Sequence, residues 1–298
     1  MPALVIPLLF LTACSPATMG MNRMAAALSD TAAAYAKDDD PEFVRTGAPA
    51  TLKMVEMMLD TNPEHAGLLM TACSGFAQYA YAFLQVDSEI LAASDARAAA
   101  ALRERAVRMY ARARGYCVRE LGTRNRALRT ALEREPSRVA SLLAATTKAD
   151  VPALFFSGAA LAGELSTVDN PLLRFGELTT VRALLARALE LDESWGGGAI
   201  HEAMIAVEGL PAIIGGSAAR AREHFDRAVK LSGGLSAFAY VTLASSVEAP
   251  ARDRAAFERA LKQALAIDVT KKPDLRLANL VAQKRARFLL ANADRMLK

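Results

Sequence analysis

The chain has 298 residues, of which 53% are hydrophobic and 23% charged, so it can bury a large core and is not disordered throughout. Lysine and arginine number 36 against 32 aspartate and glutamate residues, and the resulting net charge of +4 is spread along the chain. A charge this diffuse, without a basic arm or an aromatic recognition motif, argues against a nucleic-acid partner.

An apolar run from Ala3 to Ala13 opens the chain and stops before Cys14. It is far shorter than the roughly 20 residues of a membrane-spanning helix and fits the core of a secretory signal, which has about 7 to 15. Small residues precede Cys14 and the polar segment Ser15–Thr18 follows it, which is the layout of a bacterial lipoprotein cleavage site. We therefore predict a signal peptide over 1–13 and a lipid anchor on Cys14.

A short apolar N-terminus with an incidental cysteine is the alternative interpretation of this segment. The absence of any Lys or Arg before Arg23 departs from the positively charged start of a signal peptide. After the cleavage site, residues 14–37 are predicted to form the lipidated N-terminus with a tether or first helix, and residues 38–298 a single helical domain.

An all-α fold is predicted for this domain. Ala, Leu, Arg and Glu dominate, β-branched runs are rare, and apolar residues recur at spacings of three and four. The sequence Asp40-Pro41 predicts a helix start, with Asp40 as the N-cap and Pro41 at the first helical position.

Similar helix ends begin at residues 187, 227 and 263, a spacing close to the tetratricopeptide period of about 34 with insertions. These helix ends are Arg187–Asp192, Arg227–Ser232 and Gln263–Asp268. A helix over Leu68–Leu84 and a degenerate unit over Asp95–Leu121 extend the pattern toward the N-terminus. We predict a tetratricopeptide-like array of helical hairpins, an α-solenoid, closed by a long C-terminal helix over Leu275–Leu297.

Turns rich in glycine and proline separate the predicted helices. They fall at Asp169–Pro171, Trp195–Gly198, Gly215–Ser217, Ser232–Gly234 and Lys271–Asp274. The amides of Gly215–Ser217 precede a helix and could bind an anion, but no phosphate-binding motif such as G-x-x-x-x-G-K-[ST] is present. A plain turn between helices explains these residues more simply.

Cys73 and Cys117 are left once Cys14 is assigned to the anchor. Both lie on apolar helical faces, where a buried free thiol behaves as a small hydrophobe, and this favours two free thiols. A disulfide between them is the alternative, because an exported protein folds in an oxidising compartment.

No combination of residues typical of an enzyme is present. His201-Glu202 begins like the zinc motif H-E-x-x-H, but Ile205 occupies the place of the second histidine. Ser157-Gly158 lacks the G-x-S-x-G frame of a nucleophile elbow. We therefore predict that the protein is not an enzyme and uses no metal or other cofactor.

Aromatic residues close to small residues are the candidates for a ligand site. Phe155 and Phe156 precede Gly158 and its neighbouring alanines, Trp195 precedes a run of glycines, and Tyr79 shares a helix with other aromatic residues. Packing between helices is the simplest explanation of each. The alternative is that small residues leave room for an apolar ligand, which these five residues would contact.

Several segments in a fixed order are shared with a known family: Phe155–Ala160, Arg187–Asp192, Gly198–Glu202, Leu210–Gly216, Ala221–Ala228, Leu277–Ala286 and Leu289–Leu290. Together they resemble the T component associated with TRAP transporters, the TatT-like lipoproteins, from about Asp40 to the end of the chain, and the lipoprotein cleavage site at Cys14 agrees. Generic tetratricopeptide similarity would explain the repeat ends alone. It would not explain Leu-Pro-x-Ile-Ile-Gly-Gly followed by Leu-x-Asn-x-x-Ala-Gln-x-x-Ala.

The resemblance implies a periplasmic lipoprotein, anchored to a membrane by its lipid and similar to family members that form a homotrimer with hydrophobic-lined pores. It also implies association with the periplasmic solute-binding protein of a TRAP transporter, and assistance in the delivery of apolar or amphipathic solutes. A lipid-anchored scaffold for envelope protein assembly, without a small ligand, is the alternative function.

Overall fold

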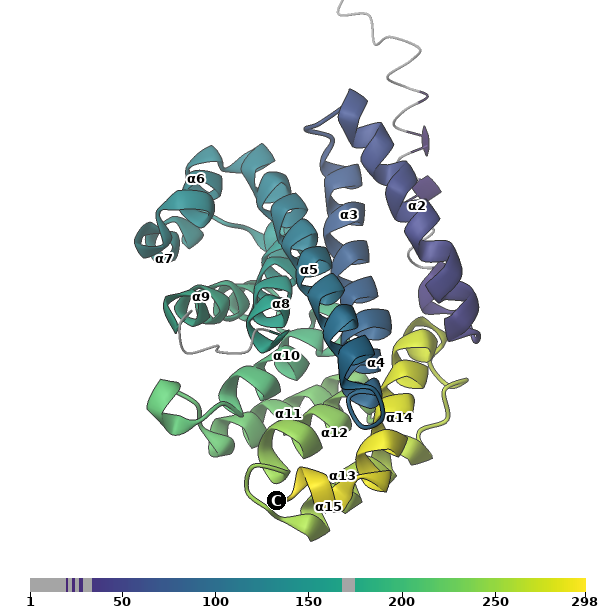
Figure 1. Cartoon of the computed structure of the whole chain (residues 1–298). Coiled ribbons are helices and arrows are strands. Elements are labelled where there is room, and N and C mark those ends of the chain that lie inside the picture. Colours follow the sequence, from purple (N-terminus) through teal and green to yellow (C-terminus); the bar gives the residue numbers. More distant parts are fainter. Residues whose placement is uncertain (1–19, 21–22, 25–26, 29–33, 168–174) are drawn as a thin grey trace, which may run out of the picture.

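The computed structural model describes residues 20, 23–24, 27–28, 34–167 and 175–298. Every regular element within them is helical, which confirms the predicted all-α class, and the helices pack side by side around shared cores (Figure 1). The predicted signal peptide, the predicted lipid-attachment residue Cys14 and the predicted turn at Asp169–Pro171 lie outside the described residues.

The N-terminal half of the fold is organised around one long helix, α5. Its helices are α2 (Pro41–Thr61), α3 (Ala66–Tyr79), α4 (Val86–Leu91), α5 (Ala96–Arg124), α6 (Arg126–Arg134), α7 (Val139–Leu143), α8 (Val151–Thr167) and α9 (Phe175–Leu191). Helix α5 packs against α3 and against α8, and α8 in turn packs against α9. A π-helical turn, Ala80–Gln85, continues α3 into α4, so the predicted helix over Leu68–Leu84 spans α3 and this turn.

The predicted start of α2 is confirmed. The Asp40 side chain accepts hydrogen bonds from the backbone amides of Glu42 and Phe43 at 2.9 and 3.1 Å, and Pro41 lies in the first turn. The carboxylate thereby satisfies two amides that have no partner inside the helix.

The C-terminal half consists of α10 (Ala199–Glu208), α11 (Ala218–Ser232), α12 (Ala237–Leu243), α13 (Arg254–Ala266), α14 (Arg276–Ala291) and α15 (Ala293–Met296). The prediction of one long helix over Leu275–Leu297 is wrong in its extent. The Asn292 amide donates to Phe288 O and Leu289 O, and its side chain also donates to Phe288 O at 2.8 Å. An asparagine that closes on the preceding turn in this way ends α14.

Glycines allow close contact between neighbouring helices at two points. A Cβ atom at Gly75 of α3 would lie 2.6 Å from Leu52 Cδ2 of α2. One at Gly163 of α8 would lie 2.5 Å from the ring of Tyr110 on α5. Both distances are below van der Waals contact, so a larger residue at either position would force the Leu52 side chain or the Tyr110 ring to move.

Two buried amide side chains of α14 hold the ends of neighbouring helices. Asn279 Oδ1 accepts from the amide of Ala237 at the start of α12 at 2.8 Å. Gln283 Nε2 donates to Ala264 O and Ile267 O at the end of α13, at 3.1 and 2.8 Å. These are the asparagine and glutamine of the C-terminal sequence motif, so that motif serves helix packing.

Helix α14 also contacts α2 and α4, so the C-terminal part of the chain lies against the N-terminal part (Figure 1). Arg285 Nε lies 2.7 Å from Glu89 Oε2, and Lys284 Nζ lies 2.9 Å from Asp87 Oδ1. Arg45 of α2 reaches the same Asp87 at 2.6 Å. These ion pairs join the two ends of the described fold.

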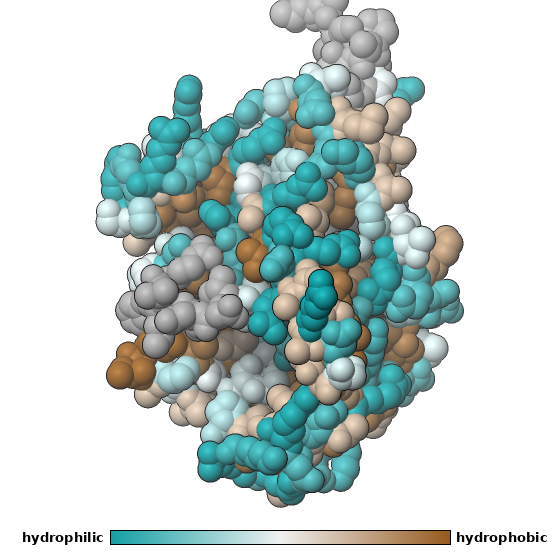
Figure 2. Space-filling model, in the orientation of Figure 1, coloured by the Kyte–Doolittle hydropathy of each residue, from teal (hydrophilic) through white to brown (hydrophobic). Residues whose placement is uncertain are grey.

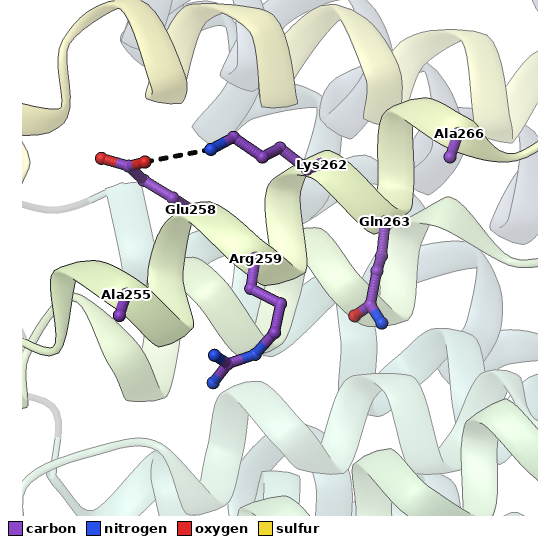
Figure 3. A pocket seen from close by; sticks show the side chains of 6 residues that line it. All are labelled: Ala255, Glu258, Arg259, Lys262, Gln263 and Ala266. Atoms are coloured by element: carbon purple, nitrogen blue, oxygen red, sulfur yellow. Dashed lines mark hydrogen bonds and ion pairs between the residues drawn. The ribbon is translucent and has the colours of Figure 1, made fainter.

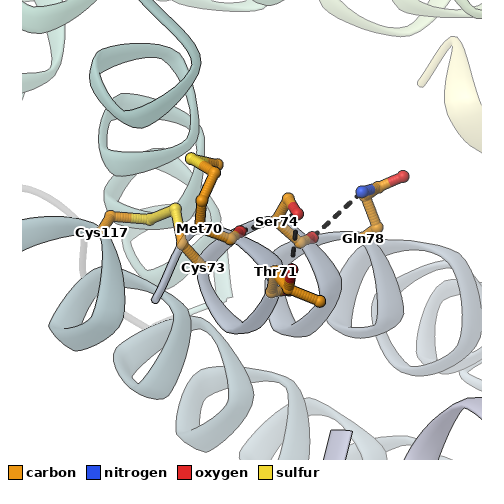
Figure 4. The surroundings of a disulfide bond; sticks show 6 residues. All are labelled: Met70, Thr71, Cys73, Ser74, Gln78 and Cys117. Carbon is orange, nitrogen blue, oxygen red and sulfur yellow. Dashed lines mark hydrogen bonds between the residues drawn. A yellow bond between two sulfur atoms is a disulfide. The ribbon is translucent and has the colours of Figure 1, made fainter. Parts of the chain in front are cut away.

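Cys73 and Cys117 form a disulfide between α3 and α5, so the preference for two free thiols is wrong (Figure 4). Both residues are fully buried and their Cα atoms lie 4.8 Å apart, within the range that a disulfide can bridge. Helical periodicity places each cysteine on an apolar face. It does not indicate that the two faces pack against each other.

We predict that the double variant Cys73→Ala, Cys117→Ala unfolds more easily than the wild type. The disulfide closes a loop with a sequence separation of 44 residues. On the loop-entropy model its loss costs about 4 kcal/mol of unfolding free energy. Denaturant unfolding of oxidised and reduced protein measures this, with Cys14→Ser as a control that should leave the unfolding free energy of the domain unchanged. Equal stability of the double variant and the oxidised wild type would contradict the prediction.

Candidate functional site

Three of the predicted ligand-contacting residues come together in an aromatic cluster, Phe155, Phe156 and Trp195. The ring centroid of Trp195 lies 4.8 Å from that of Phe155 and 6.0 Å from that of Phe156, and the two phenylalanine rings are 5.0 Å apart. All three residues are half-buried. The cluster therefore combines core packing with apolar surface that remains accessible to solvent or a ligand.

The position of Trp195 is fixed by a turn that only glycines adopt without strain. Gly196, Gly197 and Gly198 have φ values of 61°, 64° and 103°. A Cβ atom at Gly198 would lie 3.2 Å from the backbone of Ala228 on α11, so this turn also packs closely against the next hairpin. The glycine run after Trp195 thus orients the indole ring toward α8.

Helix α8 presents a buried face and a half-buried face. The half-buried face carries Pro152, Phe155, Phe156, Ala159 and Ala162, at helical spacing. The apolar residues of the other face pack with residues of α9 such as Leu184 and Leu185.

Gly158 lies on the buried face of α8. A Cβ atom there would lie 3.0 Å from the Leu185 side chain, so the glycine allows α8 and α9 to approach. A role of Gly158 in ligand contact stays a prediction.

Tyr79 lies outside the aromatic cluster. Its ring pairs with Phe83, with centroids 5.5 Å apart, and it packs against the cluster of Val44, Ala48 and Phe83, against which Leu277 of α14 also packs. This places Tyr79 where the two ends of the fold meet. Its contact with a ligand also stays a prediction.

Glu202 is a polar group of α10 that sequence reasoning did not single out as a site residue. It lies in the first turn of α10, directly after the turn that carries Trp195. Burial raises the pKa of Glu202 from its ordinary value of 4.5 to about 7. A hydrogen bond from Ser236 and the charge of Lys272 act in the opposite direction and lower the pKa, but by less. Yet the residue keeps accessible surface. The carboxyl group is therefore surrounded by protein and still open to exchange protons.

Lys272 and Tyr81 belong to the same region. A Cβ atom at Gly197, two residues after Trp195, would lie 3.2 Å from Lys272 Nζ. The ring of Tyr81 lies edge-on to Phe238 of α12, 5.2 Å between centroids. Burial raises the pKa of Tyr81, and the charges of Arg285 and Glu202 also influence it. These residues come from distant segments, and no local spacing could have grouped them.

His201 and His224 form a pair across α10 and α11, with their Nδ1 atoms 2.7 Å apart. Glu193 Oε1 faces His201 Nε2 at 3.1 Å and is itself paired with Arg227. Burial lowers the pKa of both histidines. Among the described residues, no group of three or more His, Cys, Asp or Glu side chains is placed to hold a metal ion.

Two surface hollows have linings that include no residue of the aromatic cluster. The larger, of about 530 Å³, runs along one face of α13 and is lined by Ala255, Glu258, Arg259, Lys262, Gln263 and Ala266 (Figure 3). One helix supplies its whole lining, and Lys262 pairs with Glu258 at 3.2 Å. The second, of about 270 Å³, lies beside α5 and α6 and is lined by Arg124 and Asp150, which are already paired with each other.

The Gly215–Ser217 segment is a turn between α10 and α11, as the simpler interpretation expected. The amide of Gly216 donates to Pro211 O and that of Ser217 to Glu208 O. The Ser217 side chain caps α11 by accepting from the Arg220 amide at 3.3 Å. These amides are engaged within the protein and are not directed at an anion.

The chain matches a known protein family and is similar to a known protein. A family model described as TRAP transporter T-component matches residues 37–297. An uncharacterized protein of Treponema pallidum (strain Nichols) is 28% identical over 265 residues, covering 87% of this chain and 81% of the relative. Within the described residues, no helix is both long and apolar enough to cross a membrane.

We predict that Glu202→Gln stabilises the protein at pH 8 but not at pH 4. In the folded protein the Glu202 carboxyl group keeps its proton up to about pH 7, whereas in the unfolded chain it loses the proton near pH 4.5. The free energy of unfolding therefore falls as the pH rises from 4.5 to about 7. Glutamine removes this cost, which we place at about 1–2 kcal/mol after allowance for solvent screening. Melting temperatures at both pH values measure it, with the exposed Glu223→Gln as a control. An equal effect of Glu202→Gln at both pH values would contradict this assignment.

Proposed function

The chain belongs to the TRAP transporter T-component family, and on that premise we propose that it is a periplasmic lipoprotein that acts as an accessory subunit of a TRAP-type transport system. In this role it binds the solute-binding protein of the system and a hydrophobic ligand. Membership of a family of transporter components implies a non-enzymatic role. The observation that carries the ligand part is the half-buried aromatic cluster of Phe155, Phe156 and Trp195.

The location in the periplasm is supported by the disulfide and by the N-terminal sequence. A buried disulfide is typical of proteins that fold in an oxidising compartment. In our proposal residues 1–13 are a signal peptide, Cys14 carries the lipid, and residues 14–37 tether one helical domain, 38–298, to the membrane.

The domain itself is proposed to be a tetratricopeptide-like solenoid. Helices that follow one another along the chain contact one another, as α8 and α9, α10 and α11, and α12 and α13 do. This neighbour-to-neighbour packing is typical of repeat arrays. Three such domains would assemble as a homotrimer, as the family resemblance implies.

The aromatic cluster is proposed to bind the apolar part of the ligand. Accessible ring surface that a ligand removes from water contributes about 25 cal/mol per Å² to binding. Phe155, Phe156 and Trp195 are already held in contact, so little side-chain entropy is lost when a ligand arrives. Glu202, in the first turn of the helix that follows Trp195, would offer a hydrogen-bonding group to a polar end of the ligand.

Trp195 allows a direct test, because the chain has a single tryptophan. We expect that titration with a medium-chain fatty acid such as laurate changes the tryptophan fluorescence saturably. Removal of one ring by Phe155→Ala should weaken the apparent affinity about tenfold. The control variant is Phe43→Ala, which removes an exposed ring on α2. A change that does not saturate, or an equal effect of both variants, would count against the site.

The partner is tested by a pull-down of the tagged, lipid-free protein from envelope extract, followed by native mass spectrometry. The proposal predicts co-elution of a TRAP solute-binding protein and a trimeric mass for the bait. A bait lacking Cys14 and the preceding residues keeps the whole helical domain. Elution with envelope assembly factors alone would favour the scaffold function, and a bare monomer would contradict the trimer.

A further inference from the structure

The turn between α10 and α11 exposes the most accessible large apolar side chain of the described residues, Ile213, at 91% exposure. Its neighbours Pro211 and Ala212 are also exposed, and Ile214 is half-buried. We refer to Pro211–Ile214 as the apolar tip. On the face shown in Figure 2, hydrophobic residues lie in separate patches among hydrophilic ones. Among the described residues, the next most exposed large apolar side chain is Phe43, at 66%.

A buried carboxylate braces the base of the tip. Glu208, at 4% exposure, accepts from Arg182 Nη1 at 2.7 Å and from Arg220 Nε at 2.8 Å. Arg220 Nη2 also donates to the Gly215 carbonyl at 2.8 Å, and Arg182 Nη2 to that of Val207 at 3.1 Å. Hydrogen bonds to charged groups are stronger than neutral ones, so these contacts hold the segments that enter and leave the turn.

The backbone of the turn is equally constrained. Ser217 N donates to Glu208 O at 2.6 Å, which closes the turn, and Ile214 N donates to Pro211 O at 3.0 Å. A Cβ atom at Gly216 would lie 1.6 Å from Leu210 O, so only glycine fits there. The tip is therefore a rigid projection, although it lies in a loop.

A rigid exposed apolar side chain is suited to insertion into a pocket of another protein. Its burial removes apolar surface from water, and little conformational entropy is lost because the turn is already ordered. Interface residues that carry most of the binding free energy are anchors of this kind. A lipid surface fits less well, because membrane binding needs a broad apolar face, and this turn offers one large side chain.

We propose that the apolar tip is the anchor by which this protein docks into an apolar pocket of the solute-binding protein. This rests on the proposed function, which supplies that partner. Arg182 and Arg220 share the single carboxylate of Glu208, so these three side chains together carry a net positive charge. Arg220 is 53% exposed, and the complementary pocket should therefore have an acidic rim.

The test measures the affinity of the purified solute-binding protein for the lipid-free protein and two variants, at constant salt. Ile213→Asp should weaken binding by about tenfold or more, because it places a charge in an apolar pocket. Ile213 makes no buried contact, so the variant should keep the melting temperature of the wild type. The matched control Met57→Asp changes an apolar residue of α2 that is 62% exposed, and binding should stay within about twofold.

The outcomes separate this proposal from the function on which it rests. If the wild type binds the solute-binding protein and Ile213→Asp binds it equally well, the apolar tip is not the anchor, and the proposed function still stands. No binding by the wild type would overturn both. A loss of the trimer, or of vesicle binding, in Ile213→Asp without loss of the partner would assign the tip to self-association or to a lipid surface and overturn the proposal.

Glu208→Gln tests separately whether the ion pairs of Glu208 hold the turn rigid. The Glu208 side chain is buried, so the substitution does not change a contact with the partner. It should speed amide hydrogen exchange at Gly216 and Ser217 and weaken partner binding. Faster exchange with unchanged affinity would show that the rigidity of the turn contributes nothing to docking.

Discussion

The ion pair between Arg285 and Glu89 joins the two ends of the described fold. The Arg285 side chain is only 14% exposed, and a guanidinium in that position must be neutralised nearby. Glu89 can do so only if α4 lies against α14. The same helix α14 positions α12 through Asn279 and α13 through Gln283. One helix therefore links the first helices of the domain to the last ones.

The candidate site depends on a second arrangement, centred on the start and end of α10. The glycine turn before α10 directs Trp195 toward Phe155 and Phe156, and the first turn of α10 carries Glu202. The end of α10 supplies Glu208, which braces the apolar tip. The proposed ligand contacts and the proposed partner anchor thus belong to one short helix, so movement of α10 would affect both.

Local sequence patterns predicted what depends on neighbours in the chain. The helical class, the Asp40 cap and the turns containing Trp195–Gly198 and Gly215–Ser217 follow from spacing and residue type, and the structure has them. Other features depend instead on which helices pack against each other. They are the disulfide, the raised pKa of Glu202 and the pairing of Tyr79 with Phe83. A sequence period of 3.6 residues indicates which face of a helix is buried. It does not indicate which other helix packs against that face, so these three features could not be predicted.

The contact between α14 and α4 also determines when the domain can be completed. The residues that form it are separated by 196 and 197 positions along the chain. During synthesis the N-terminal helices emerge long before their closing partner exists. Contacts of this sequence separation form late, because a long loop must be closed before they contribute. A chain truncated before α14 would leave Glu89 without Arg285, and Asp87 with Arg45 alone. It would also expose the flank of α12 and α13 that α14 covers, a surface by which quality-control proteases can distinguish incomplete chains from finished ones.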